Sequence, residues 1–218
     1  MTQRLSPPPR PPQRLYLTTP PVGDTAAFMP QLEAALSAAD IAAVLLRLAP
    51  ADQRTLVNRA KAVAEIVQRR DVALLLEDKA ELVARAGADG AHLTGVEAFA
   101  AALALLKPDR IAGCGGLHSR HDAMLAAETG ADYVMFGEPP PPGGHRLPWP
   151  QSQERLTWWA ELFEGPCVGY AASLDEVAPL AQTGADFIAL GEWIWTQPQG
   201  VTAAIEAAAE TLAAPAAR

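Results

Sequence analysis

The sequence predicts an α/β protein, a single (β/α)8 TIM barrel, on three observations. Short apolar runs alternate eight times with longer amphipathic stretches rich in Ala, Leu and Glu. The runs are hydrophobic on nearly every residue, as expected of strands that are covered on both faces. A Gly-Ala-Asp triplet also recurs at 87–89, 130–132 and 184–186, each time between a helical stretch and an apolar run. Such a shared joint indicates a repeated βα unit.

The elements follow from these patterns in chain order. The predicted strands occupy 14–18, 41–47, 72–77, 90–93, 110–113, 133–137, 166–170 and 187–191. The predicted helices occupy 24–38, 51–70, 79–86, 96–106, 119–129, 151–163, 174–182 and 200–213. Ser119, Ser152 and Ser173 stand near three helix starts, where a hydroxyl can accept from the first free N–H groups. An open doubly wound sheet is the alternative, but residues 18–21 after the first strand read TTPP rather than a GxGxxG motif.

Composition limits the domain organisation and the partners. A chain of 218 residues, half of them hydrophobic, is long enough for one well-buried domain. We expect residues 1–13, which are proline-rich, to form a disordered tail, and 14–218 to form the barrel. The net charge of −8 argues against nucleic acid and anionic membranes as partners. Two cysteines without metal-type spacing, and no signal peptide or spanning segment, favour the cytoplasm.

Charged residues at the predicted strand ends are the first candidates for function, because barrel chemistry lies at the carboxyl ends of the strands. Arg47 ends the second strand and is a natural anchor for phosphate or carboxylate, with a surface ion pair as the alternative. Glu77, Asp78 and Glu97 follow neighbouring strands, and carboxylates so placed suit Mg²⁺. Helix capping or pairing with nearby cations explains the same three residues equally well.

His118 is the candidate for proton transfer. It follows the fifth predicted strand in a glycine-bearing loop, where it could act as a general acid or base or stand as a solvated turn residue. His92 lies inside a strand run, which favours a buried structural histidine. Cys114 is expected to be a small apolar residue at a strand end rather than a nucleophile.

Several segments resemble the thiamine phosphate synthase/TenI family of (β/α)8 barrels. They are RLYLTTP at 14–20, LLRLA at 45–49, LLLEDKAELVARAGADGAHLTG at 74–95, LHSRHDAMLAAETGADYVMFG at 117–137 and VGYAASLDEVAPLAQTGADFIALGEWIW at 168–195. The resemblance implies a TIM barrel of thiamine biosynthesis. It also implies a magnesium-dependent transferase that joins a pyrimidine diphosphate to a thiazole phosphate and releases pyrophosphate.

The family's functional positions are only partly preserved. The resemblance implies a role for Arg47 in catalysis, for Asp78 with Glu97 and Glu77 at the metal, and for His118 in proton transfer. Ser119 and Ser173 are further candidates for ligand binding, and Arg146 could partly replace the family's phosphate loop, which is absent after the sixth predicted strand. Family-typical polar or glycine residues are replaced at Leu45, Ala49, Glu77, Gly115 or Gly116, Ala171 and Ala172, and at the 139–146 loop.

These departures weaken the expected diphosphate site. A diphosphate needs several cations and closely approaching backbone N–H groups, and Glu192 after the last strand adds a repelling carboxylate beside the usual phosphate cradle. We therefore expect weak or lost synthase activity. A TenI-like thiazole tautomerase, or a non-catalytic protein that binds a small metabolite, are the alternatives. The expected partner is a small phosphorylated or heterocyclic metabolite, and a homo-oligomer is possible.

Overall fold

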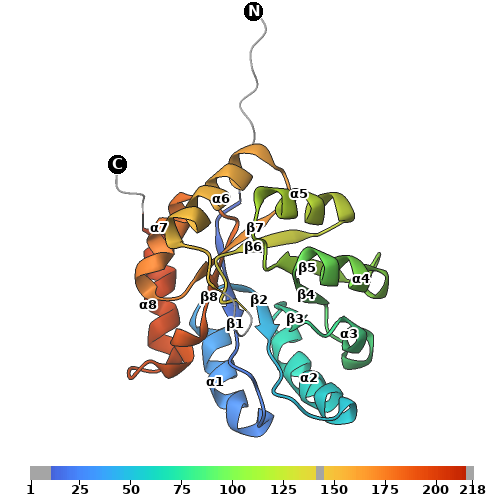
Figure 1. The fold of residues 1–218 in the computed structure, drawn as a ribbon. Coiled ribbons are helices and arrows are strands. Elements are labelled where there is room, and N and C mark those ends of the chain that lie inside the picture. Colours follow the sequence, from blue (N-terminus) through green and yellow to red (C-terminus); the bar gives the residue numbers. More distant parts are fainter. Residues whose placement is uncertain (1–10, 141–144, 215–218) are drawn as a thin grey trace, which may run out of the picture.

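The strands form a closed parallel barrel in the order β1 to β8. The structure is a computed structural model that describes residues 11–140 and 145–214. Each strand pairs with its sequence neighbours, and β8 pairs with β1 to complete the ring. The strands are β1 (Arg14–Thr18), β2 (Ile41–Leu46), β3 (Ala73–Glu77), β4 (Gly90–Thr94), β5 (Ile111–Gly115), β6 (Tyr133–Phe136), β7 (Cys167–Ala171) and β8 (Phe187–Leu190). The predicted TIM barrel is thus confirmed (Figure 1).

The helices surround the strands as an outer ring (Figure 1). They are α1 (Thr25–Ala38), α2 (Gln53–Gln68), α3 (Ala80–Ala86), α4 (Val96–Leu106), α5 (Arg120–Thr129), α6 (Trp149–Leu162), α7 (Val177–Gln182) and α8 (Val201–Ala213). Two short 3₁₀ helices, η1 (Leu174–Glu176) and η2 (Glu192–Thr196), follow β7 and β8. The ends of the described strands and helices lie close to the predicted ones, and η2 was not expected.

Of the three predicted helix caps, one is confirmed. Ser119 caps α5 and forms a capping box with Asp122, each side chain bonding the other residue's backbone N–H. The prediction for Ser152 was wrong, because α6 begins three residues earlier, after Pro148, and buries Ser152 inside the helix. Ser173 precedes η1 but makes no side-chain capping bond. Ser173 therefore holds the cap position without using its hydroxyl, whereas Ser152 does not hold the cap position at all.

The repeated Gly-Ala-Asp triplet has a defined structural role. Its glycines end α3, α5 and α7 in the left-handed region, with φ of 70°, 116° and 83°. The carboxylates of Asp89, Asp132 and Asp186 accept from backbone N–H groups at the starts of β3, β5 and β7, at 2.7, 2.7 and 2.8 Å. Each triplet therefore closes one helix and anchors the start of the preceding strand.

Replacement of Asp186 by alanine is expected to lower the free energy of unfolding by about 2 kcal/mol, because it removes a charge-assisted bond to the Cys167 N–H. Urea denaturation checks this value. Asp175→Ala, at an exposed carboxylate on η1, is the control and should change stability by less than about 0.5 kcal/mol. Equal effects of both substitutions would contradict the role assigned to the triplet.

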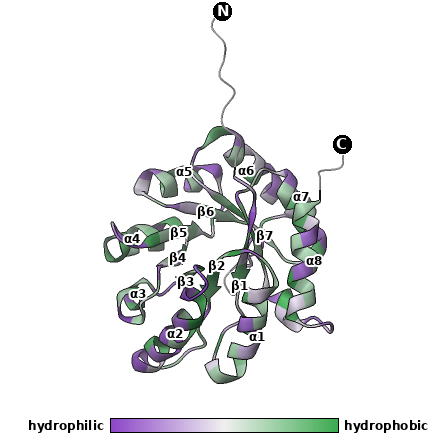
Figure 2. Cartoon of the chain, turned by 180° about the vertical axis from the view of Figure 1, so that it is seen from behind, coloured by the Kyte–Doolittle hydropathy of each residue, from purple (hydrophilic) through white to green (hydrophobic). Residues whose placement is uncertain are grey.

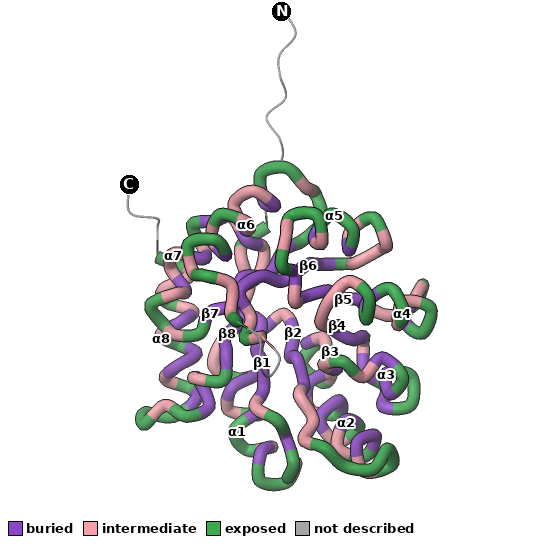
Figure 3. The backbone as a smooth tube through the Cα atoms, in the orientation of Figure 1, coloured by how far each residue is buried: buried purple, intermediate pink, exposed green. Residues whose placement is uncertain are grey.

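The core is divided between two sets of apolar residues. The larger set fills the layer between strands and helices, where the strand tube is buried and the outward turns of the helices are exposed (Figure 3). Hydropathy follows the same division, with hydrophilic segments on the outer helix faces (Figure 2). The smaller set lies inside the barrel and consists of Tyr16, Ala43, Leu45, Leu75, Tyr133, Met135, Val168, Tyr170 and Ala189. Three tyrosines make this interior unusually polar.

The described part of the chain contains no helix that is both long enough and apolar enough to cross a membrane. The predicted tail falls mostly on residues 1–10, which lie outside the described residues. At its end, Gln13 donates to the carbonyl oxygens of Ala181 and Ala185 at 2.9 and 2.6 Å.

Candidate functional site

A cavity of about 430 Å³ opens at the carboxyl ends of the strands. Its polar lining comes from six strands and the loops that follow them: Thr18, Arg47, Glu77, Asp78, His92, Thr94, Glu138 and Tyr170. Leu45, Met135, Pro139 and Pro140 supply the apolar part of the wall. This is the end of a TIM barrel at which reaction chemistry is found, so the cavity is the candidate functional site.

Arg47 lies in this cavity, as the sequence predicts, but it is engaged by two carboxylates. Its Nε donates to Glu77 Oε2 at 2.9 Å, and its Nη1 donates to Glu192. Burial alone would lower the pKa of Arg47, but the two carboxylates outweigh it and the pKa is raised. The pKa of Glu77 is nevertheless also raised, because burial and the charges of Asp78 and Glu192 outweigh Arg47. Negative charge is therefore in excess around this guanidinium.

The predicted metal carboxylates are not equivalent. Asp78 lines the cavity, and its carboxylate accepts from the Thr94 backbone N–H and hydroxyl at 2.8 and 3.0 Å. The Asp78 backbone has a positive φ of 48°. Glu77 is held by Arg47, and Glu97 is an exposed residue outside the cavity lining. Within residues 11–140 and 145–214, no group of three or more His, Cys, Asp or Glu could hold a metal. A dedicated magnesium site does not fit these residues, although Asp78 could be a single ligand.

Glu138 is a carboxylate at the end of β6 that the sequence did not assign to the site. Its Oε1 accepts from the Gly116 N–H. A Cβ at position 115 would lie 2.3 Å from Glu138 Oε1 and 2.5 Å from His92 Nε2, so glycine there leaves the space that both side chains occupy. Burial raises the pKa of Glu138 to about 7, although the Gly116 N–H and Arg146 favour its charged form.

A buried hydrogen-bond chain runs from this cavity into the barrel. His92 Nδ1 lies 2.9 Å from the Tyr133 hydroxyl, which lies 3.0 Å from the Tyr16 hydroxyl. The His92 and Tyr133 rings are stacked, with centroids 5.6 Å apart. Burial lowers the pKa of His92 to about 4 and raises the pKa of Tyr16 well above its usual value. His92 is therefore a neutral buried histidine, as predicted, with tyrosine as its partner.

Arg146 forms a second arginine–carboxylate unit between the loops that follow β6 and β7. Its two terminal nitrogens donate to Glu176 at 3.1 and 2.9 Å, and its Nε donates to the Gly137 carbonyl at 2.7 Å. Glu176 Oε2 also accepts from the Ala172 backbone N–H at 2.7 Å. Glu176 therefore binds both Arg146 and the Ala172 N–H, the two groups at which the family resemblance would place a phosphate.

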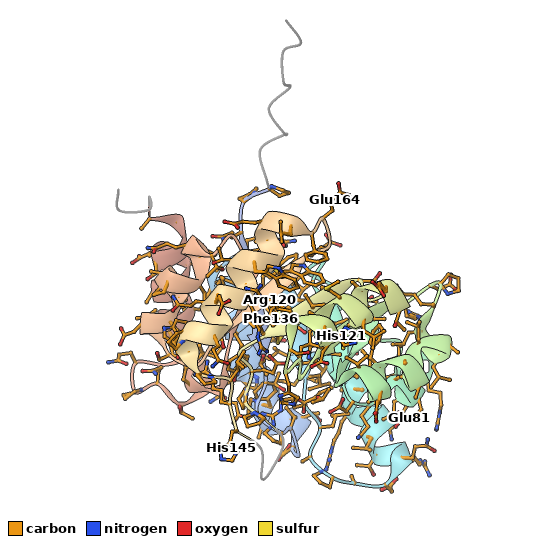
Figure 4. The ribbon with its side chains drawn as sticks, turned by 45° about the horizontal axis from the view of Figure 1, so that its top comes forward. Glu81, Arg120, His121, Phe136, His145 and Glu164 are labelled. Carbon is orange, nitrogen blue, oxygen red and sulfur yellow. The ribbon has the colours of Figure 1, made fainter. Side chains whose placement is uncertain are left out.

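The remaining candidates do not line the main cavity. His118 is exposed and lines a small crevice that also contains Glu138 and His145. Figure 4 shows His145 at the edge of the molecule, whereas Phe136 lies near its centre. Ser119 uses its hydroxyl for the α5 cap. Ser173 faces a separate groove beside α8.

Cys114 is buried at the end of β5, and burial raises the pKa of its thiol to about 12. Its thiolate is therefore disfavoured, as expected for an inert strand-end residue.

Two signals in the sequence could have identified Glu138. The serine that the family resemblance implies near residue 115 is replaced by glycine, and a carboxylate stands at the end of the following strand. The ends of neighbouring parallel strands lie side by side, so Glu138 after β6 can fill the space that a side chain at position 115 on β5 would occupy.

A closed barrel with charged side chains at the carboxyl ends of its strands defines the class as a TIM-barrel protein with a small-molecule site. Residues 15–194 match the family described as "Thiamine monophosphate synthase". The chain is 43% identical over 194 residues to a thiamine-phosphate synthase of Rhodospirillum centenum, covering 88% of this chain and 94% of that one. It is 40% identical to the Hyphomonas neptunium thiamine-phosphate synthase, covering 91% and 93% of the two chains. The chain belongs to the thiamine monophosphate synthase family.

The fold is shared with a solved structure of more distant sequence. Thiamine phosphate pyrophosphorylase from Pyrococcus furiosus superimposes with a TM-score of 0.75 at 21% identity, over 91% of this chain and 95% of that chain. This likeness supports the barrel, while the family assignment depends on the more similar sequences.

Proposed function

We propose that this family member has a degenerate diphosphate site and retains little or no thiamine phosphate synthase activity. One observation carries the proposal: both arginines that could receive substrate phosphates are bound by the chain's own carboxylates. Arg47 is bonded to Glu77 and Glu192, and Arg146 to Glu176. A phosphate group must displace a carboxylate at each position before it gains a charge-assisted contact. As further proposals, the chain divides at residue 13 and the protein is cytoplasmic.

The synthase reaction would place particular demands on this cavity. A pyrophosphate must leave while positive charge develops on the pyrimidine, so catalysis needs cations at the diphosphate and a shielded wall around the ring. In this chain Arg47 is the cation inside the cavity, and Leu45 and Ala49 stand where the resemblance implies further polar groups. Asp78 offers Mg²⁺ a single protein ligand, which is too few for a dedicated metal site in this cavity.

A thiamine phosphate assay with pyrimidine diphosphate, thiazole phosphate and Mg²⁺ tests the proposal. Loss of one or two charge-assisted contacts corresponds to about 2–5 kcal/mol of transition-state stabilisation, or about 30- to 5,000-fold in rate. We expect a deficit of this size relative to the Rhodospirillum centenum relative assayed in parallel. Robust turnover that collapses in Arg47→Ala would overturn the proposal and show that Arg47 leaves its carboxylates when substrate binds.

The second candidate function is a proton-transfer reaction such as that of a TenI-like tautomerase. It is favoured by Glu138, whose pKa of about 7 allows the carboxyl group to give and to take a proton near neutral pH. His118 lines the crevice beside it. Exchange of a thiazole ring proton for deuterium, followed by NMR in the wild type and in Glu138→Gln and His118→Ala, distinguishes the two groups.

A further inference from the structure

We propose that the mouth cavity binds an unphosphorylated heterocyclic cation, with Glu138 and Asp78 facing its positive charge and Thr18 bonding its ring or amino group. The inference rests on the proposed function, because it assigns a ligand class to the same cavity. Four features of the described residues support it: the charge of the wall, the use of the backbone donors, one unpartnered hydroxyl, and the size of the cavity.

The charge of the wall favours a cation. The cavity is lined by the carboxyl groups of Glu77, Asp78 and Glu138 and by the guanidinium of Arg47. That guanidinium is already bonded to Glu77 and to Glu192. A narrow cavity with low-dielectric walls strengthens the field of such an excess, so anionic ligands are repelled and cations attracted.

Backbone donors in the loops at this end of the barrel are already used by carboxylates. The Thr94 N–H bonds Asp78, the Gly116 N–H bonds Glu138, and the Ala172 N–H bonds Glu176. Backbone N–H groups at such loops are what normally recognise a phosphate. Here each of the three would have to lose a charged partner of its own chain before it could bind one.

Thr18 provides an independent sign that a ligand belongs in the cavity. Thr18 is one of the residues that line the cavity, it is only 4% exposed, and its buried Oγ1 has no hydrogen-bond partner. Buried hydroxyls are nearly always partnered in folded proteins, so an unpartnered one at a binding cavity calls for a ligand atom. A hydroxyl can accept from an amino group or donate to a ring nitrogen.

The size and the apolar wall suit a flat ring. A volume of about 430 Å³ accommodates a small organic molecule. Leu45, Met135 and Tyr170 provide the apolar surface against which a heterocycle can pack. A hydrated Mg²⁺ would satisfy the carboxylates alone, and would leave this apolar wall without a function.

Isothermal titration calorimetry with defined probes tests the proposal. Thiamine carries a thiazolium cation and an aminopyrimidine without phosphate, and thiamine phosphate differs from it by the phosphate alone. In buffer without Mg²⁺, thiamine is expected to bind at least about tenfold more tightly than thiamine phosphate, and pyrophosphate is expected not to bind up to about 1 mM. Addition of 5 mM Mg²⁺, roughly a physiological excess, should not reverse this order.

Two variants and a matched control locate the binding groups. Thr18→Val should weaken thiamine binding about fivefold or more, and Glu138→Gln about tenfold. Ser152→Ala is the control, because Ser152 Oγ is the other buried hydroxyl without a partner among the described residues and lies outside the cavity lining. Thiamine affinity should be unchanged in this control.

The outcomes separate this inference from the proposed function. Tighter binding of thiamine phosphate or pyrophosphate, no thiamine binding up to about 1 mM, or unchanged affinity in Thr18→Val would each overturn the inference. The proposed function fails only if the thiamine phosphate assay shows robust synthase turnover. A protein without turnover that prefers phosphorylated probes would therefore reject the inference and leave the proposed function standing.

Discussion

Replacement of Glu138 by glutamine is expected to stabilise the protein by up to about 3 kcal/mol at pH 8 and to leave its stability unchanged near pH 4. The reason is the pKa of Glu138, which burial raises from 4.5 to about 7. Above pH 7 the folded protein keeps a carboxylate ionised where ionisation is costly, whereas the unfolded chain ionises it freely. Below pH 4.5 the group is protonated in both states and this cost disappears.

The sign of this effect follows from proton binding. Between pH 4.5 and 7 the folded state holds a proton on Glu138 that the unfolded state has released, so stability falls as pH rises through this window. His92 acts in the opposite direction, because burial lowers its pKa from 6.5 to about 4. Its contribution is fully present above pH 6.5 and is lost as pH falls towards 4. Between pH 4.5 and 6.5 the two contributions nearly cancel in the wild type.

Urea denaturation between pH 4 and pH 8 measures both contributions. In Glu138→Gln the loss of stability caused by ionisation of Glu138 is absent. The free energy of unfolding should therefore rise steadily from pH 4.5 to 6.5, because His92 loses its proton in the unfolded chain over this range. The groups that face Glu138 are His92 on β4, Cys114 on β5, the Gly116 N–H directly after β5, Tyr133 on β6 and Arg146 in the following loop.

Glu206→Gln, at an exposed position on α8, is the control and should show no such pH-dependent gain. Equal stability of the wild type and Glu138→Gln at pH 8 would contradict the raised pKa.

The Glu138→Gln variant would also show whether Glu138 serves ligand binding or only the fold. Residues kept at a cost to stability are typical of binding and catalytic sites, where a strained or poorly solvated group serves the ligand. Glu138→Gln is expected both to fold more stably at pH 8 and to bind thiamine less tightly. A purely structural residue would not give this combination.

The barrel could be predicted from the sequence because its signals are local. Apolar runs, helical stretches and the Gly-Ala-Asp joint each depend on residues close together in the chain, and their spacing alone limits the topology. Helix starts were less predictable, as Ser152 shows, because α6 begins at Trp149, directly after Pro148, and no side-chain cap marks its first turn.

The site was harder to predict because its contacts join distant positions. Arg47 and Asp78 were identified, but the pairing of Arg47 with Glu192 joins residues 145 positions apart. Glu192 was expected to repel a phosphate, and the structure adds that it bonds Arg47. Thr18 carries no signal in the sequence at all, because an unpartnered hydroxyl is a property of the packed barrel.

Replacement of Tyr133 by phenylalanine is expected to lower the free energy of unfolding by about 2–5 kcal/mol. Its hydroxyl is bonded to His92 Nδ1 and to the Tyr16 hydroxyl, all in the buried interior of the barrel. Removing it leaves the two partners buried, and each unsatisfied group costs about 1–3 kcal/mol. Gly113 is part of the same arrangement, since a Cβ there would lie 2.1 Å from Tyr133 Cζ and would displace the ring.

Tyr16→Phe is the matched control, because it removes one hydroxyl from the end of the chain and leaves the bond between Tyr133 and His92 in place. Tyr16→Phe should lower the free energy of unfolding by about 1 kcal/mol. The double variant should lose less than the sum of the two single variants, because only His92 is then left without its partner. Simple additivity would show that the three side chains do not act as one network. A loss below about 1 kcal/mol in Tyr133→Phe would mean that His92 Nδ1 finds another partner.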